Sequence, residues 1–421
     1  MRRESSENPQ QQPHPELWIW TGDAVYAKNQ TLAGLRAAYE SLTRNVYYQR
    51  FTRQVFIDGI WDDHDLGVND AGILPDREAR ASLYHTFLNS GRLLKRKPAS
   101  VATAIVDKGG LYHSKVLKKD AGRAKIIFLD TRYSREQHFI PSLGQIRLPF
   151  TALAAAAIRS AYSLLSLGRT YEGDVLGEAQ WRWLEEELSS SHRGRVAAHD
   201  ASSPAAAAAA QAAAAAAAHP SDSFLQRQAR ESNERLHRHD FDFHILVSSI
   251  QLFTSNPAVE SWGHFPAAKR RLVSLLERYD PSGLLVLSGD VHHGETVSVP
   301  VFLDEGVEAA AEAAERTGGA AGAAARERAP HRVWLEVTSS GLTHTAADGL
   351  VNSLLCPLML AAFARHRREG DGVYLGRNFG SVVFDKVRVR VRVGAENRPD
   401  GGMGCCSLVL FLLPLLASCA V

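Results

Sequence analysis

The 421-residue sequence has little sulfur and little net charge, and each scarcity excludes a class of protein. Of its four cysteines, Cys356 stands alone and Cys405, Cys406 and Cys419 lie near the C-terminus. This distribution predicts neither a disulfide framework nor a zinc site. The formal net charge of +2 indicates no broad electrostatic surface for a polyanion. We therefore expect no nucleic-acid partner.

Long hydrophobic runs are missing except at the C-terminus. Residues 1–15 are polar and contain no apolar core of a signal peptide. Residues 407–421 are apolar but too short to span a bilayer as a helix, which takes about 20 residues. Small residues precede this tail, so it could be a lipid-anchor signal, a buried terminal segment or a gene-model artefact. Membrane association through the tail stays open. The location also stays open: it is secretory, membrane-anchored or extracellular if a missing signal precedes the chain, and otherwise intracellular.

Two alanine-rich segments interrupt an otherwise ordinary composition. They lie near residues 192–223 and 307–330, and their low complexity indicates insertions in loops. We expect residues 1–16 to be a disordered or truncated N-terminus. One domain is expected over residues 17–394, followed by a linker and apolar tail over residues 395–421.

Short apolar runs alternate with amphipathic segments along the expected domain. The runs predict strands, and apolar residues three or four positions apart predict helices. Strands are expected at Glu16–Trp20, Gln54–Ile60, Lys125–Leu129, Phe243–Ile250, Gly283–Leu287, Val333–Val337 and Val382–Val393, and helices at Thr31–Thr52, Asp76–Leu94, Gly177–Leu188 and Ala267–Tyr279. The alternation predicts an α/β fold built from layers.

Acidic residues and histidines come directly after several of these strands, where ligands collect in open α/β sheets. After the first strand, Asp23 follows Gly22 and precedes Tyr26 by three positions. Carboxylate and phenolate oxygens are hard donors that suit Fe(III), Mn or Ca. An Asp that caps a helix and a Tyr packed in the core would give the same pattern.

A stronger cluster, Trp61-Asp62-Asp63-His64-Asp65, follows the second strand. Three carboxylates within four positions repel one another unless a cation neutralises them or water solvates them. Because the cluster follows an apolar strand, the pattern favours a cation over an exposed acidic turn. Asn69 and Asp70 follow closely and offer further oxygen donors.

Histidines and arginines after later strands complete the candidate site. Asp290 and His292 alternate, so both could face one centre, although a pair of surface histidines would also fit. Arg132 could clamp a phosphate with its fork of donors, or form a salt bridge, for example with Asp130. His344 could contact substrate or hydrogen-bond within its own loop.

Taken in order, these motifs resemble the PhoD-type alkaline phosphatases, a branch of the calcineurin-like metallophosphatases, and most of all the eukaryotic-type members. The resemblance is carried by Gly22–Tyr26, Trp61–Asp70, Leu129–Arg132, Leu176–Trp181, Ser288–His292, Thr338–His344 and Asn378–Gly380. It implies a sandwich of two mixed β-sheets flanked by helices, with a metal site at the strand ends. It also implies a metal-dependent phosphoester hydrolase, a phosphatase or phosphodiesterase, that attacks a phosphorylated small molecule with a metal-activated water.

The resemblance and the clusters together give the expected site. The expected metal ligands are Asp23, Tyr26, Asp63, Asp290 and His292. The expected catalytic residues are His64, as general acid or phosphate contact, Asp63 and Arg132. The expected substrate-binding residues are His64, Asn69 and His344.

Two elements of the family pattern are missing. Residues 1–15 contain neither Asp nor Cys, so the first metal-binding block is absent, as a truncated gene model would explain. Val247–Gln251 stands where a histidine block is expected, which favours oxygen-liganded Fe and Ca over zinc or Mn. The missing block keeps an alternative open: a catalytically impaired relative that binds phosphorylated ligands or is anchored at a membrane.

Overall fold

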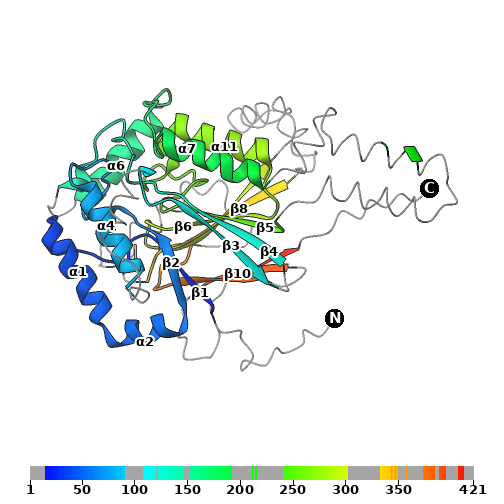
Figure 1. Ribbon diagram of the computed structural model, residues 1–421. Helices are drawn as coiled ribbons and strands as arrows, with labels where there is room; N and C mark the ends of the chain where they lie inside the picture. The colour runs from blue at the N-terminus through cyan, green and yellow to red at the C-terminus, as the bar shows by residue number, and fades with distance from the viewer. Residues whose placement is uncertain are drawn as a thin grey trace, which may run out of the picture.

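A six-stranded mixed β-sheet lies at the centre of the fold (Figure 1). The computed structural model describes residues 15–90, 108–119, 122–146, 151–191, 211, 214–215, 241–301, 332–342, 344–346, 348, 357, 360, 373–384, 388–394 and 406–411. In sheet order, the strands are β3 (His113–Lys119), β4 (Gly122–Phe128), β5 (Phe243–Val247), β6 (Leu284–Ser288), β8 (Arg332–Ser339) and β7 (Gly294–Val301). The inner strands β4, β5, β6 and β8 are parallel, so their carboxyl ends meet at one edge.

Two smaller sheets lie on one side of this central sheet. The strands β1 (Leu17–Thr21) and β2 (Phe56–Ile60) form a parallel pair. The strands β9 (Phe379–Phe384), β10 (Arg388–Gly394) and β11 (Cys406–Phe411) form an antiparallel sheet. Figure 1 shows β1, β2 and β10 below the central sheet and two long helices above it. The predicted α/β class, with layered sheets flanked by helices, is confirmed.

Both faces of the central sheet are covered, which explains why its inner strands β5 and β6 are mostly apolar and almost fully buried. Successive side chains of a strand point to opposite faces. Ile127 of β4 packs in a cluster with α7 (Glu178–Ser190) and α11 (Pro266–Tyr279). Its neighbours Ile126 and Phe128 pack in a second cluster with β1 and β2. The core therefore lies on both sides of the sheet and leaves its carboxyl edge for a site.

The segment expected to form one helix over Thr31–Thr52 is two helices, α1 (Leu32–Arg44) and α2 (Val46–Gln54). Asn45 separates them with extended backbone angles, φ −63° and ψ 124°. Its side-chain oxygen accepts hydrogen bonds from the N–H groups of Tyr47 and Tyr48 and so caps α2. The single-helix prediction is wrong because the apolar spacing continues across the break.

The strand expected over Val382–Val393 is also two strands. β9 and β10 pair antiparallel, with Val382 opposite Val391. The alternation of valine and arginine belongs to β10, whereas β9 ends in three consecutive apolar residues, Val382, Val383 and Phe384, so the predicted strand joined two different patterns. The remaining described helices are α3 (Asp63–Leu66), α4 (Arg77–Leu88), η2 (Leu143–Gln145), α6 (Thr151–Leu164) and η3 (Trp262–His264).

Several predictions fall on parts of the chain outside the described residues. The expected insertions near 192–223 and 307–330 lie there, apart from residues 211 and 214–215. So do residues 1–14 and most of the apolar tail; its described part forms β11 and pairs with β10. No helix in the described ranges has the length and apolar character needed to cross a bilayer.

Candidate metal centre

Loops that follow β1, β2 and β6 meet at one end of the strands. Gly22, directly after β1, has φ 108°, and a Cβ built there would lie 2.4 Å from the Cβ of Asp62. A Cβ at Gly289, directly after β6, would lie 2.5 Å from the carbonyl oxygen of Thr21. Only glycine at these two positions lets the three loops approach so closely. The Asp65 carboxylate ties two of the loops together, accepting a hydrogen bond from the Ala24 N–H at 3.1 Å.

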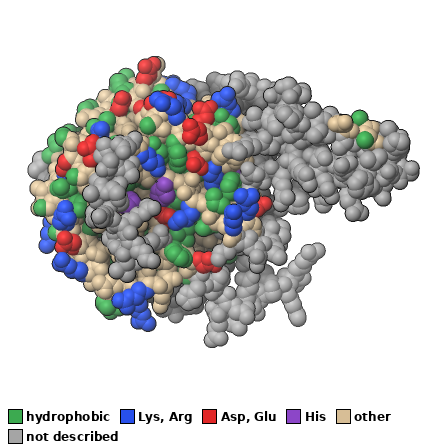
Figure 2. All heavy atoms as spheres, in the orientation of Figure 1, with side chains coloured by type: hydrophobic (Ala, Val, Ile, Leu, Met, Phe, Trp, Pro, Cys, Tyr) green, Lys and Arg blue, Asp and Glu red, His purple; other side chains and the backbone are tan. Residues whose placement is uncertain are grey.

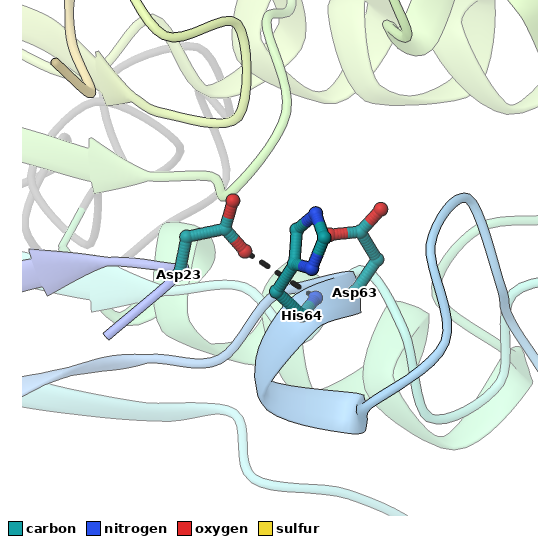
Figure 3. A group of neighbouring side chains, drawn as sticks. All are labelled: Asp23, Asp63 and His64. Atoms are coloured by element: carbon teal, nitrogen blue, oxygen red, sulfur yellow. Dashed lines mark hydrogen bonds between the residues drawn. The ribbon is translucent and has the colours of Figure 1, made fainter. Parts of the chain in front are cut away.

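Asp23, Asp63 and His64 come together at this junction (Figure 3). One potential ligand atom from each lies within 4.8 Å of the others. Asp23 extends from the loop after β1, and Asp63 and His64 begin α3. Figure 3 shows the Asp23 carboxylate pointing toward the first turn of α3, where it accepts a 3.3 Å hydrogen bond from the His64 N–H.

A second group of four carboxylates overlaps the first. It contains Asp23, Asp62, Asp63 and Asp290, again with ligand atoms within 4.8 Å of one another. Oδ2 of Asp62 and Oδ1 of Asp63 are buried and have no hydrogen-bond partner. A buried polar atom without a partner is costly, and a cation would satisfy both oxygens and neutralise the repulsion. This all-oxygen donor set fits a hard metal ion.

Electrostatics in the pocket reflect this crowding of carboxylates. Burial raises the pKa of Asp62 and Asp290, and it raises the pKa of Asp63 to about 8. Burial also acts on Asp23, but the charge of His64 and contacts with His292 and Tyr26 outweigh it, so the pKa of Asp23 is lowered. Without a cation, burial and mutual repulsion therefore oppose ionisation of Asp62, Asp63 and Asp290, whereas Asp23 favours its ionised form.

Three of the six non-glycine residues with positive φ in the described part of the chain lie in these loops. Asp23, Asp290 and His292 have φ of 54°, 69° and 59°, a region that residues other than glycine seldom adopt. Each such residue costs about 1–3 kcal/mol and persists only where its surroundings impose the conformation. The strained residues all bear side chains that point into or border the carboxylate group, as expected of a functional site.

Tyr26 links the carboxylates to a group of imidazoles. Its hydroxyl donates to Oδ2 of Asp23 at 2.8 Å and lies 3.1 Å from Nε2 of His292. Its ring lies with its centroid 4.2 Å from that of His64 and 4.3 Å from that of the exposed His344. Histidine side chains reach the surface close together on the face shown in Figure 2. Seven expected site residues are thus brought to one place: Asp23, Tyr26, Asp63, His64, Asp290, His292 and His344.

Comparison with known proteins adds evidence on the fold. No family model and no curated protein matches the sequence. Eleven chains of solved structures match, one of them described as "Structure of PhoD", with a TM-score of 0.50 and 13% sequence identity. The fold is PhoD-like. The match covers 94% of this chain but only 64% of that chain, so this chain spans less than two thirds of the PhoD structure.

Arg132 borders the group of four carboxylates in this PhoD-like fold, with one terminal nitrogen 3.9 Å from an oxygen of Asp290. The Arg132 guanidinium is fully buried and forms ion pairs with Asp62 and Glu260. Of the two interpretations of Arg132, the structure thus supports the salt bridge, with these partners in place of Asp130. Asn69 is half-buried beside Gly144, where a Cβ would lie 2.5 Å from its Nδ2.

Sequence reasoning missed three residues that shape the site. Asp62 was visible in the acidic motif, but only its neighbour Asp63 was assigned as a ligand. Ser249, whose hydroxyl donates to Oδ1 of Asp62 at 2.6 Å, follows β5 and could have been noticed as a polar strand-end residue. Glu260 lies in a loop far along the chain, where no motif or spacing marks it.

Proposed function

We propose that this protein is a metal-dependent phosphoester hydrolase, a phosphatase or phosphodiesterase of PhoD type. The observation that carries the proposal is the group of four carboxylates, two of whose buried oxygens lack a partner, in a PhoD-like fold. A metal ion held there would lower the pKa of a bound water and polarise the phosphoryl group. Because the motifs are most similar to eukaryotic-type members, the proposal extends to that branch.

His64 is proposed to act as general acid or to balance charge on the phosphoryl group. Burial lowers its pKa, but the carboxylates of Asp63 and Asp23 outweigh this, and the net pKa is raised. A His64 that keeps its proton near neutral pH can donate it to a leaving oxygen or stabilise developing negative charge. Its backbone N–H donates a hydrogen bond to Asp23, which fixes the position of the His64 backbone from which the ring extends.

Tyr26 and His292 are proposed to complete the ligand set beside Asp23, Asp63 and Asp290. Burial and the nearby Asp23 raise the pKa of Tyr26, so the phenol keeps its proton until a cation displaces it. Its hydroxyl orients Oδ2 of Asp23 meanwhile. Fe and Ca are the proposed metals for this mostly oxygen donor set, with zinc or Mn less favoured. Mn²⁺ is a hard ion that carboxylates also bind, so it can serve as a probe of the site.

The substrate is proposed to be a phosphorylated small molecule bound over the histidines. His344 is exposed and its ring lies against that of Tyr26 at a tilt of 52°, so it is placed to contact a substrate at the edge of the site. Asn69 is kept as a second proposed contact. Association with a membrane through the apolar tail also stays a proposal, since most of that tail lies outside the described residues.

The test is metal-dependent hydrolysis by the full-length protein. Purified protein loaded with Fe and Ca should hydrolyse an aryl phosphate monoester or diester, and Asp63→Asn should lower the rate by at least about 100-fold. The variant is well matched because an amide keeps the shape of the side chain. Equal rates in the metal-loaded wild type and the variant would contradict the proposal. Binding of inorganic phosphate without hydrolysis would instead support the impaired, ligand-binding relative.

A further inference from the structure

Glu260 is a buried carboxylate outside the group of four, and cationic or imidazole side chains surround it. Its two oxygens accept hydrogen bonds from both terminal nitrogens of Arg132, at 3.0 and 3.1 Å. Oε1 also accepts from Arg135 and lies 3.3 Å from Nε2 of His138. Glu260 and both arginines are almost fully buried. Such a bidentate pair fixes the plane of a guanidinium as well as its position.

Arg132 connects Glu260 to the carboxylate pocket, because it binds both Glu260 and Asp62. While its terminal nitrogens bind Glu260, its Nε donates to Oδ1 of Asp62, and one terminal nitrogen also donates to the Ala71 carbonyl oxygen at 3.2 Å. The guanidinium has no exposed surface. Each of its three nitrogens donates within the protein, and four of its five N–H groups are engaged, so together with its burial these bonds hold Arg132 in a structural role.

The two oxygens of Asp62 have different surroundings as a result. Oδ1 receives the hydrogen bonds from Arg132 and Ser249. Oδ2 is buried without a partner, and Asp62 belongs to the group formed with Asp23, Asp63 and Asp290. Binding one oxygen to the protein while the other lacks a partner orients a carboxylate as a metal ligand needs.

We propose that Glu260 is a positioning residue for the metal pocket, acting through Arg132 on the orientation of Asp62. This inference rests on the proposed function. Without the Glu260 charge, the terminal nitrogens of Arg132 lose their bidentate partner. Asp290 lies 3.9 Å from one of them and would become the nearest carboxylate for a new pair. Arg132 would then turn from Asp62 and compete with the metal for Asp290.

Glu260 could alternatively belong to a second metal site, since its ligand atoms lie within 4.8 Å of atoms from Asp63 and Asp70. The existing pairs argue against this alternative. Glu260 is already neutralised by two arginines, and Oδ2 of Asp70 is 3.0 Å from Arg159. Carboxylates that are paired in this way need no further cation. The two arginine pairs therefore favour a positioning role for Glu260 over a role as a metal ligand.

The experiment measures binding of Mn²⁺ alone to the metal-stripped, full-length chain by titration calorimetry. Glu260→Gln should weaken Mn²⁺ binding by about 10- to 100-fold, the usual effect of losing a group that orients a ligand. Glu260→Asp keeps the charge and should recover part of the loss. Glu336→Gln is the matched control: Glu336 is equally buried but accepts from the N–H groups of Leu252 and Phe253, and its loss should leave Mn²⁺ affinity unchanged.

A double-variant comparison separates positioning from general damage. If Glu260 acts through Asp62, Glu260→Gln should change Mn²⁺ affinity little when Asp62→Asn is already present. The same fold-loss in both backgrounds, or no loss in either, would overturn the positioning role. Should Glu260→Gln fail to fold, Glu260→Asp decides: Mn²⁺ affinity unchanged from the wild type would overturn it.

The outcomes also separate this inference from the proposed function. A wild type that binds none of Mn²⁺, Ca²⁺ and Fe would overturn both. A wild type that binds Mn²⁺ and hydrolyses phosphoesters, with a Glu260→Gln variant that binds equally well, overturns only the positioning role. Mn²⁺ binding that depends on Glu260 and Asp62 without any hydrolysis supports the positioning role and contradicts the proposed hydrolase.

Discussion

Replacing Asp63 by Asn should stabilise the metal-free protein while removing its ability to bind metal. Asp63 is 1% exposed, and burial together with Asp23 and Asp62 raises its pKa from 3.8 to about 8. Oδ2 accepts a 2.6 Å hydrogen bond from the Asp70 N–H, and Oδ1 has no partner. An amide at position 63 can still accept the hydrogen bond from the Asp70 N–H, and it cannot carry the negative charge that burial disfavours.

The magnitude follows from proton linkage. A carboxyl whose folded pKa is raised binds more protons in the folded state, so stability is lost as pH rises from about 4 to about 8. At pH 7 the unfolded chain has released a proton that the folded chain keeps, which costs at most about 4 kcal/mol. Asp63→Asn removes this cost, and we expect a gain of about 1–4 kcal/mol at pH 7 and little change at pH 4.

The assay is thermal or urea unfolding of chelator-treated protein at pH 4, 7 and 9. Added metal should reverse the order of stability, because a ligand that binds only the folded wild type stabilises it alone. Asp76→Asn is a suitable control, since Asp76 is partly exposed and pairs with Arg80 at 2.8 Å, away from the pocket. Equal stability of wild type and Asp63→Asn at pH 7 and 9 without metal would refute the reasoning.

Three further predictions concern the scaffold. His264 is neutral in the fold, with Nδ1 accepting from Tyr162 at 2.6 Å and Nε2–H donating to the Val259 carbonyl oxygen at 2.9 Å; burial lowers its pKa to about 3. As pH falls from 6.5 to about 3, the imidazole of His264 therefore takes up a proton in the unfolded chain but not in the folded one, which lowers the free energy of unfolding by at most about 5 kcal/mol. His264→Gln should remove this part of the pH dependence, as measured by urea unfolding across that pH range. Asp58 is buried, but hydrogen bonds from His113 and Lys115 outweigh burial and lower its pKa. Asp58→Asn should lower the free energy of unfolding by about 2 kcal/mol at pH 7 and by less as pH falls below 4, and an equal loss at pH 7 and below pH 4 would count against this. Asn45→Ala removes the cap of α2 and should cost about 1 kcal/mol in the same assay, whereas Asn45→Gly should cost only a few tenths.

The strands and the loops that follow them could be predicted because their signals are local. The run Phe243–Ile250 must be buried wherever it lies, and β5 occupies its first five residues. The acidic motif after Ile60 predicted a cation site, and the structure brings two of its carboxylates into a group that could hold a metal ion. Breaks in regular patterns were harder, since one Asn at position 45 outweighs an apolar spacing that continues on both sides.

The interior of the site could not be predicted because it depends on contacts between distant residues. Arg132 and Glu260 are 128 positions apart, and nothing in either neighbourhood indicates the pair. Whether Arg132 faces a substrate or a carboxylate is decided by Glu260 and Asp62, which only the fold brings to it. Conversely, Asp23 and Asp290 could be proposed together because each closely follows a strand, β1 or β6, and ligands collect at the carboxyl ends of strands whatever their separation along the chain.

The central claim is that the group of four carboxylates holds a metal ion. Anomalous diffraction from crystals of the full-length protein grown with Mn²⁺ tests it most directly. The account predicts a peak within bonding distance of Asp23, Asp63 and the unpartnered Oδ2 of Asp62. Well-ordered crystals with no peak among these residues, or with a peak only beside Glu260, would contradict it.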